Sequence, residues 1–336
     1  MSILVTGAAG FIGMHVCKYL LNRGDVVIGI DNLNDYYDVK LKKDRIANIS
    51  SFNNFSFIKT DIKDYESLCS VFDSHKIDRV IHLAAQAGVR YSLVNPGAYV
   101  SSNIHGFMNI LELCRHNSVD HLVYASSSSV YGSNTSLPFK ESDNTDHPLS
   151  LYAASKKSNE MMAHTYSHLY DLPTSGLRFF TVYGPWGRPD MALFIFCKAI
   201  LQEEFIEIFN QGDMKRDFTY IDDIVEGVIK ILDKPPAKDA KFCTKKPKPN
   251  RSISPYRIFN IGNSNTRSLM EYIETLEEVL DKKAKKRYLD MQPGDVKNTY
   301  SDTSEIQEWV CFKSETNIES GIQSFVNWYK RYYQYD

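Results

Sequence analysis

The chain has 336 residues, of which 43% are hydrophobic and 24% charged, and its formal net charge is -2. This composition is typical of a globular protein and excludes a disordered chain. The length fits two packed units, or one large α/β domain with a smaller lobe. The charge balance offers no overall basic surface for nucleic acid, so we expect no nucleic-acid partner.

The start of the chain and its cysteines indicate a cellular location. The sequence opens on an apolar run without a basic leader, and no later apolar run is long enough to cross a membrane. Its six cysteines are scattered without a C-x-x-C pair, which favours reduced thiols over a disulfide frame or a metal knuckle. We therefore expect a cytoplasmic protein with no membrane partner and no metal site.

Apolar runs alternate with helical stretches through the first half of the chain. The predicted strands are 3–5, 26–30, 55–58, 80–83, 122–125 and 174–179, and the first predicted helix is 11–23. Continuous apolar runs are typical of strands buried on both faces of a sheet. The pattern predicts an α/β fold with a Rossmann-type, doubly wound parallel sheet.

Two longer predicted helices, 95–117 and 152–170, carry apolar residues on more than one face. Such helices often pack against a second subunit. We therefore expect a homodimer formed through a helix–helix interface.

The alternation of strand-like and helical stretches becomes irregular beyond Gly184. We expect helices at 191–202, 222–232 and 268–280 and a strand at 206–209. The predicted division is a Rossmann domain at 1–181, with returns at about 217–232 and 256–262, and a smaller mixed α/β substrate lobe at 182–336. A basic, proline-containing insertion at about 235–254 is interpreted as a flexible solvated loop rather than a binding patch.

Three glycines follow the first predicted strand, in the order Gly7, Gly10 and Gly13, with Phe11 and Ile12 between the last two. The first permits a tight turn, the second lets a pyrophosphate approach the backbone, and the third lets helix and strand pack closely. The helix that follows would meet the phosphates with free N–H groups. The context of strand, turn and helix predicts a dinucleotide site.

Asp31 ends the second predicted strand, 18 residues past Gly13. A carboxylate there binds ribose hydroxyls and repels a 2′-phosphate, so NAD is favoured over NADP. The alternative is that Asp31 only caps a turn with Asn32. Asp61 is a candidate for adenine contact. The remaining candidate cofactor contacts are Asn32, Ile62, Leu83, Ala84, Ala85, Tyr152 and Lys156.

Tyr152 and Lys156 are four residues apart, so they share one face of a predicted helix. A nearby ammonium would lower the pKa of the phenol from about 10 by favouring the phenolate. Alone, such a pair is usually an ordinary solvated pair. The hydroxyl cluster from Ser126 to Ser129, at the end of a sheet strand, adds weight because open α/β sheets bind ligands there.

These motifs resemble the extended short-chain dehydrogenase/reductase family, from residue 3 to about residue 332. The resemblance rests on the three glycines, on Tyr152-x-x-x-Lys156 and on a serine about 25 positions earlier. Three segments are most similar to the UDP-glucuronate 4-epimerases. They are HLAAQAGVRYS at 82–92, VYGPWGRPDM at 182–191 and RDFTYIDD at 216–223.

The resemblance implies a reaction on a UDP-sugar. NAD takes a hydride from C4 while Tyr152, helped by Ser127, removes the O4 proton; Lys156 completes the catalytic set. The 4-keto sugar then rotates and takes the hydride back on its other face. The implied conversion is UDP-glucuronate to UDP-galacturonate, as used in polysaccharide biosynthesis, with NAD bound throughout.

The resemblance also indicates substrate contacts. Ser129 stands where dehydrating and decarboxylating relatives carry Glu, which favours plain epimerisation. Ser128, Ser129 and Thr181 are candidates for binding the sugar carboxylate, and Thr181 replaces the Asn of galactose epimerases. The candidate contacts to diphosphate and uridine are Arg90, Arg188, Arg216 and Asp295, although Gln292 replaces an Arg of the galactose epimerases.

Other functions remain open at this point. A UDP-N-acetylhexosamine 4-epimerase would use the same catalytic residues, and a UDP-glucuronate decarboxylase would release a pentose product. Outside catalysis, folds of this kind are reused for binding, so an NAD(H)-binding sensor protein is the non-enzyme alternative.

Overall fold

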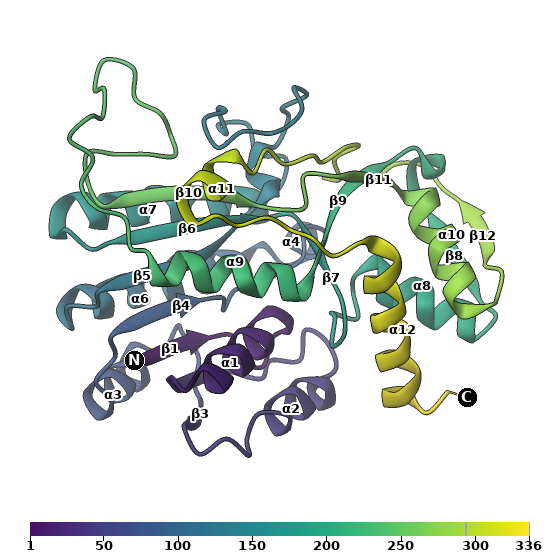
Figure 1. Cartoon of the computed structure of the whole chain (residues 1–336), viewed down its shortest axis with the longest axis horizontal. Coiled ribbons are helices and arrows are strands. Elements are labelled where there is room, and N and C mark those ends of the chain that lie inside the picture. Colours follow the sequence, from purple (N-terminus) through teal and green to yellow (C-terminus); the bar gives the residue numbers. More distant parts are fainter. Residues whose placement is uncertain (293, 336) are drawn as a thin grey trace.

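The computed structural model describes residues 1–292 and 294–335, and a seven-stranded sheet forms its centre (Figure 1). The strand order is β10-β6-β5-β4-β1-β2-β3, and all pairings are parallel. The strands are β1 (Ser2–Thr6), β2 (Val26–Asp31), β3 (Phe55–Lys59), β4 (Arg79–His82), β5 (His121–Ser127), β6 (Thr174–Phe179) and β10 (Tyr256–Ile261). The predicted doubly wound parallel sheet is confirmed.

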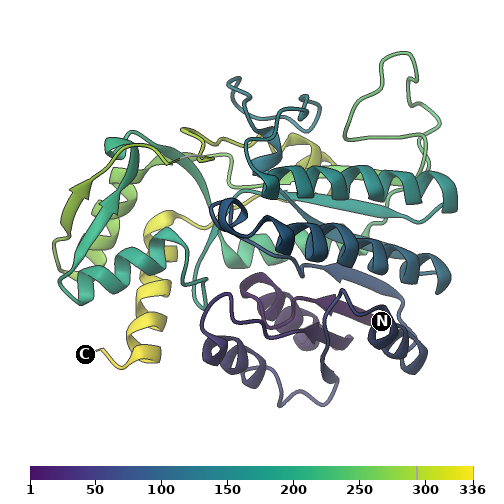
Figure 2. The same ribbon diagram turned by 180° about the vertical axis from the view of Figure 1, so that it is seen from behind.

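Helices cover both faces of this sheet, as Figures 1 and 2 show from opposite sides. One layer holds α1 (Phe11–Arg23), α9 (Ile221–Asp233) and α11 (Ser304–Val310), and the other holds α3 (Tyr65–Ser74), α6 (Phe107–His116) and α7 (Leu151–Tyr170). Successive strand residues point to opposite layers: Ile3 and Val5 pack into one core, and Leu4 packs into the other. Burial on both faces explains the continuous apolar runs.

The expected helix 95–117 is helical but not uniform. It comprises α5 (Pro96–Tyr99), the π-helix η1 (Val100–Gly106) and α6. Within η1, the amide of Asn103 accepts a hydrogen bond from Gln86 N and donates one to Gln86 O. A π-helical turn is rare and often marks a functional site. The spacing of residues in the sequence does not reveal where such a turn occurs. The remaining helices of this part are α2 (Val39–Ala47), α4 (Tyr91–Val94) and η2 (Ser128–Tyr131).

A smaller lobe is built mostly from the second half of the chain. It contains β7 (Thr181–Tyr183), α8 (Ala192–Leu201), β8 (Phe205–Ile208), η3 (Phe209–Gly212), β9 (Lys215–Tyr220), β11 (Thr266–Ser268), α10 (Leu269–Leu280), β12 (Lys285–Tyr288) and α12 (Ile318–Tyr333). β9 lies between β7 and β11, and β12 pairs with β8. Across residues 1–292 and 294–335, no helix combines the length and the hydropathy needed to traverse a bilayer.

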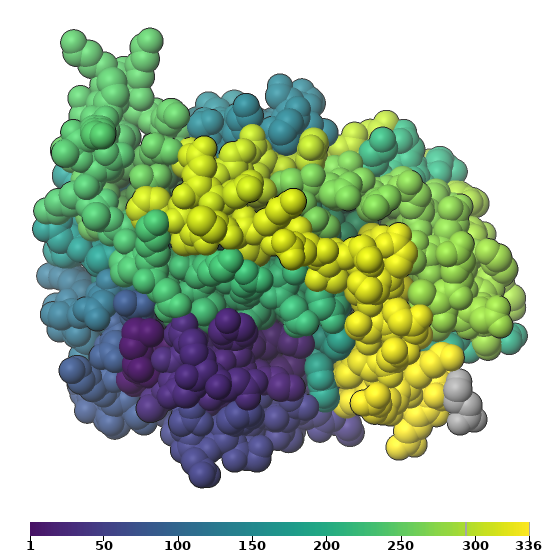
Figure 3. All heavy atoms as spheres, viewed as in Figure 1, coloured from purple at the N-terminus to yellow at the C-terminus, as the bar shows by residue number. Residues whose placement is uncertain are grey.

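The segment between α9 and β10 extends away from the body as a long loop (Figures 1 and 3). This is the basic insertion, and residues 235–255 contain neither helix nor strand. Near its ends, Lys238 pairs with Asp171 at 2.7 Å and Arg251 pairs with Glu305 at 2.7 Å. The insertion is therefore tied to the helical layers at both ends.

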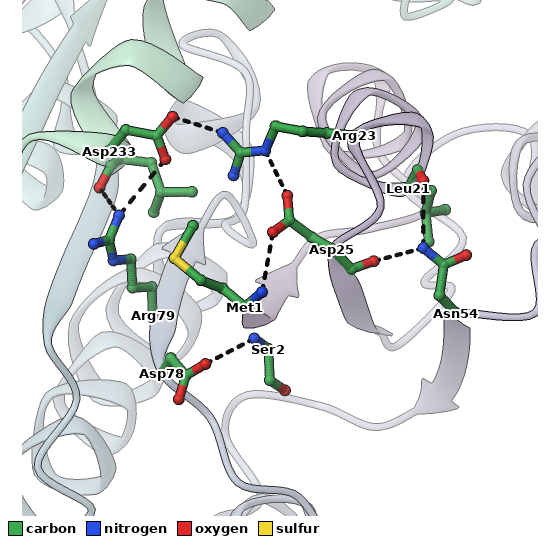
Figure 4. Close-up of polar contacts among 10 residues, drawn as sticks. Met1, Ser2, Leu21, Arg23, Asp25, Asn54, Asp78, Arg79 and Asp233 are labelled. Carbon is green, nitrogen blue, oxygen red and sulfur yellow. Dashed lines mark hydrogen bonds and ion pairs between the residues drawn. The ribbon is translucent and has the colours of Figure 1, made fainter.

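Polar contacts join the elements at the amino end of β1 (Figure 4). The terminal amine of Met1 lies 3.2 Å from Asp25, and Arg23 lies 2.6 Å from both Asp25 and Asp233. These contacts connect β1, the end of α1 and the end of α9. They lie at the edge of the sheet opposite to the glycine turn, which follows the carboxyl end of β1.

Candidate active site at the carboxyl ends of the strands

The turn between β1 and α1 leaves no room for side chains at its glycines. Gly7 has a φ of +73°, and a Cβ on it would lie 2.8 Å from Ala84 N. A Cβ on Gly13 would lie 2.0 Å from Gly7 O. Helix α1 starts after Gly10, and no side chain caps it. The first N–H groups of the helix can therefore face an anion.

Asp31 and its neighbours lie beside this turn. The Asp31 carboxylate accepts hydrogen bonds from Ala9 N at 3.2 Å and from Leu33 N at 2.8 Å. Asn32 donates to Asp61 at 2.9 Å. Burial raises the pKa of Asp31, and the Leu33 N–H and the Lys42 ammonium oppose that rise. The structure thus brings the predicted ribose and adenine contacts to one edge.

The chain after β4 closes the other side of the turn. Thr6 Oγ1 accepts hydrogen bonds from the backbone N–H of Leu83 at 3.2 Å and of Ala84 at 3.0 Å. Ile62 packs against Gly106, where an added Cβ would lie 2.7 Å from the Ile62 side chain. The segment that includes Ala85 therefore runs beside the glycine turn, while Ile62 lies against the helical layer.

The hydroxyl cluster lies at the end of β5, as expected. The hydroxyl of Ser127 donates to Ser129 Oγ at 3.2 Å, and Ser128 begins η2. Ser126 instead points into the core and donates to Glu160 at 2.6 Å. Glu160 also receives two hydrogen bonds from the buried Arg178, at 2.8 and 2.9 Å. Glu160 thus fastens α7 to β5 through Ser126 and to β6 through Arg178.

The expected contact between Lys156 and Tyr152 is not formed. Lys156 Nζ donates to Ala125 O at 2.9 Å, because α7 turns this side chain toward β5. The pKa of Tyr152 is raised rather than lowered: burial raises it, and a hydrogen bond with Ser127 and the charge of Arg188 only oppose that rise. Burial also lowers the pKa of Lys156 to about 8. Helical spacing places both residues on one face without bringing their ends together.

Arg188 connects the two halves of the site. Its charge acts on Tyr152, and it lines a cavity together with Phe11 and Thr181. Its guanidinium forms two hydrogen bonds with Asp190, at 2.9 and 2.5 Å, and Asp190 accepts a third from Tyr36 at 3.1 Å. The start of α1 and the lobe segment after β7 therefore share one cavity.

The other predicted substrate residues form a separate group. Arg90 pairs with Asp295 at 2.9 Å, and Arg216 donates to Val296 O at 2.6 Å and to Lys297 O at 2.8 Å. Burial lowers the pKa of Arg216, and the charge of Asp295 opposes that change. Three distant segments thus place two guanidinium groups around one carboxylate. Pro293, beside this group in the chain, lies outside the described residues.

Several side chains at the site carry no motif and were missed. Lys42 donates to both oxygens of Asn34 at 2.6 Å, close to Asp31. Tyr36 and Asp190 orient Arg188, and only the spacing of Arg188 and Asp190 hinted at a pair. Arg178 was detectable in principle, because an arginine within a buried strand requires a partner.

Comparisons with known proteins agree with this geometry. Residues 3–262 match the model of the NAD dependent epimerase/dehydratase family. The chain is 55% identical to "Protein CapI" of Staphylococcus aureus, covering 99% of this chain and 100% of that protein. It is 49% identical to "UDP-glucuronate 4-epimerase 4" of Arabidopsis thaliana, covering 100% of this chain and 77% of that one.

A solved structure is also similar over the whole chain. It is the UDP-glucuronic acid 4-epimerase from Bacillus cereus in complex with UDP-glucuronic acid and NAD. The TM-score is 0.87 and the identity is 34%, covering 99% of this chain and 100% of that chain. The likeness therefore includes the lobe as well as the sheet.

Replacing Lys156 by Met tests the burial of its ammonium. We expect Lys156→Met to be about 1–3 kcal/mol more stable than the wild type at pH 7, because the native state there holds a desolvated charge. Because the native pKa is about 8 and thus lowered, the wild type gains stability as pH rises above 8, and the advantage of the variant shrinks. Urea unfolding at pH 7 and pH 9.5 measures both effects.

The control is Lys18→Met, which removes an exposed ammonium from α1. We expect it to change the free energy of unfolding by less than about 0.5 kcal/mol at either pH. A Lys156→Met protein less stable than the wild type at pH 7 would contradict the reasoning.

Proposed function

This chain belongs to the NAD dependent epimerase/dehydratase family, and from that premise we propose that it converts UDP-glucuronate to UDP-galacturonate by inverting C4. One observation carries the proposal. The Ser127 hydroxyl, at the end of β5, and the Arg188 charge both act on the Tyr152 phenol, at the start of α7. Arg188 also lines a cavity together with Phe11, at the start of α1 beside the glycine turn. The similarity to named UDP-glucuronate 4-epimerases along the whole chain supports the choice of sugar.

The residues of the glycine turn fit a bound NAD. Gly10 presents no side chain at the start of α1, so a diphosphate can reach the backbone N–H groups. The Asp31 carboxylate has oxygens able to accept further hydrogen bonds from ribose hydroxyls. Asn32, Asp61, Ile62 and the segment 83–85 complete the proposed contacts. When bound, NAD supplies the acceptor and later the donor of the C4 hydride.

The protein's own groups move the proton. Tyr152 takes the proton from O4 as C4 is oxidised to the ketone, and returns it when C4 is reduced on the opposite face, so no net redox change occurs. Ser127, whose hydroxyl opposes the rise in the pKa of Tyr152, orients O4. Because the pKa of Tyr152 is raised, forming its phenolate requires additional positive charge nearby. Lys156, on the same face of α7, is the proposed source of that charge.

Hydroxyl groups are the proposed contacts of the sugar carboxylate. Ser128 and Ser129 follow β5, and Thr181 starts β7 beside the cavity that Arg188 lines. Hydroxyl hydrogen bonds orient a carboxylate without burying a further cation. A 4-keto glucuronate loses carbon dioxide when its carboxylate is free to align with the carbonyl, so this orientation preserves the substrate.

Arginines are the proposed contacts of the UDP group. Arg90 and Arg216 lie around Asp295, and Arg188 lies near Tyr152. Guanidinium forks match diphosphate oxygens, and the Asp295 carboxylate can accept hydrogen bonds from the uridine ribose. A cytoplasmic location and a role in polysaccharide biosynthesis follow as parts of the same proposal, since they rest on the sequence and on the activity.

Purified protein tests the substrate directly. We expect the protein to convert UDP-glucuronate to UDP-galacturonate and to convert little UDP-N-acetylglucosamine. Chromatography of the reaction mixtures measures both conversions. Tyr152→Phe should lower the rate by at least about 100-fold, because no group then accepts the O4 proton. Tyr166→Phe, on the same helix but away from Ser127, should remain active. A pentose product would instead identify a decarboxylase, and no turnover of any UDP-sugar would favour a binding protein.

Thr181→Ala tests the carboxylate contact. We expect KM for UDP-glucuronate to rise about tenfold, the effect of one lost hydrogen bond to a charged group. A neutral UDP-hexose, measured as a competitive inhibitor, should bind as before. Unchanged kinetics with UDP-glucuronate would remove Thr181 from the site.

We also propose that the protein is a homodimer formed through α6 and α7, which lie side by side in one layer (Figure 2). Apolar side chains on this layer remain exposed. They are Val100 at 53%, Met108 at 39%, Met161 at 62% and Leu169 at 60%. Apolar helix faces of this kind are typical of subunit interfaces.

Light scattering tests the dimer. The wild type should have about twice the 38.5 kDa mass of the chain. Met161→Glu should shift the mass to that of a monomer, because a carboxylate would be buried without a partner. Ile195→Glu, which alters an exposed apolar residue on α8, should leave the dimer intact. A monomeric wild type would refute the proposal.

A further inference from the structure

Arg45, on α2, is an arginine without any solvent exposure. All of its N–H groups are used. Nε and Nη2 both donate to Trp186 O, at 3.2 and 2.7 Å. Nη2 also donates to Gly187 O at 3.0 Å. Nη1 donates to Ala9 O at 3.0 Å and to Tyr37 Oη at 2.6 Å. Within residues 1–292 and 294–335, no carboxylate lies within ion-pair distance of it. A buried cation bound mainly to backbone carbonyls is unusual.

The carbonyls that Arg45 binds belong to two loops of different function. Ala9 lies in the glycine turn, while Trp186 and Gly187 lie in the segment that ends at Arg188. A second contact joins the same parts, because the His15 ring lies 3.0 Å from Pro185 O. The Arg45 side chain of α2 thus joins the dinucleotide turn to the substrate segment, and His15 of α1 adds a further contact to that segment.

The segment after β7 needs such support. Trp186 has a φ of 62°, a left-handed conformation that a bulky residue rarely adopts. Its carbonyl receives two hydrogen bonds from Arg45, and its indole packs against Trp328 and Tyr332, with ring centres 5.3 and 5.2 Å away. These contacts select the backbone conformation that carries Arg188 toward Tyr152.

We propose that Arg45 is a positioning residue that holds the cofactor turn and the substrate segment as one unit, and so keeps the dinucleotide bound between turnovers. Moving either loop would leave buried N–H groups of Arg45 without acceptors, which makes separate opening of either loop unfavourable. Lysine carries fewer donors and no planar fork, so it cannot bind both loops in this way. The identity of the two ligands rests on the proposed function.

The test compares Arg45→Lys with the wild type. After purification, bound NAD is measured following acid release, and its loss is followed during dialysis. We expect NAD to dissociate at least about tenfold faster from the variant. With saturating NAD, KM for UDP-glucuronate should rise about tenfold while kcat changes less than about threefold, because Arg45 acts on binding and not on the reacting atoms.

Arg23→Lys is the matched control. Arg23 also joins two elements, at the opposite end of α1, but it contacts only Asp25 and Asp233 among the described residues (Figure 4). It should retain NAD and substrate affinity like the wild type. Equal loss of NAD from both variants would reduce Arg45 to general stability and overturn the proposal.

Tyr37→Phe is a milder second variant, because it removes only one acceptor of Arg45. It should increase both NAD dissociation and KM in the same direction by a smaller factor, and it decides the matter if Arg45→Lys does not fold. A folded Arg45→Lys or Tyr37→Phe with wild-type NAD retention and KM overturns the inference. If the wild type fails to turn over UDP-glucuronate, the proposed function fails, while the comparison of NAD retention still decides the role of Arg45.

Discussion

The close approach of α1 to the end of β1 is the constraint on which the site depends. A side chain at Gly13 would collide with the carbonyl of Gly7, so only glycine lets the helix begin there. The helix start therefore lies at the carboxyl edge of the sheet, between Asp31 and Ala84. Parallel strands bring all their carboxyl ends to that edge, which is why Ser127, at the end of β5, lies on the same edge as the glycine turn.

Buried cations hold this edge in one arrangement. Lys156 binds the carbonyl of Ala125, Arg178 binds the carboxylate of Glu160, and Arg45 binds carbonyls of two loops. Each contact joins two different elements or loops: α7 to β5, β6 to α7, and α2 to the glycine turn and the segment after β7. Because a buried charge without partners is strongly unfavourable, each also resists local displacement. The protein's own hydrogen bonds therefore fix the arrangement of this edge.

Sequence patterns predicted much of the fold and part of the site. The strands of the sheet, the glycine turn and the helix that carries Tyr152 lie where periodicity and motifs placed them. The geometry between side chains was less predictable. Spacing put Lys156 on the same face as Tyr152, but the carbonyl of Ala125, just past the end of the β4–β5 pairing, accepts the hydrogen bond of the ammonium instead. The π-helical turn likewise includes Asn103, which is hydrogen-bonded to Gln86, 17 residues earlier.

The amino-acid sequence alone determined the alternation of strands and helices, the position of the turn and the residue types available at the strand ends. These depend on interactions between residues a few positions apart, which local patterns record. Tertiary structure decided which of those residues meet. Arg90 pairs with Asp295, 205 residues away, and Arg45 binds Trp186, 141 residues away. Such contacts form only when two lobes pack, because packing removes water and leaves each buried polar group to find its partner within the protein.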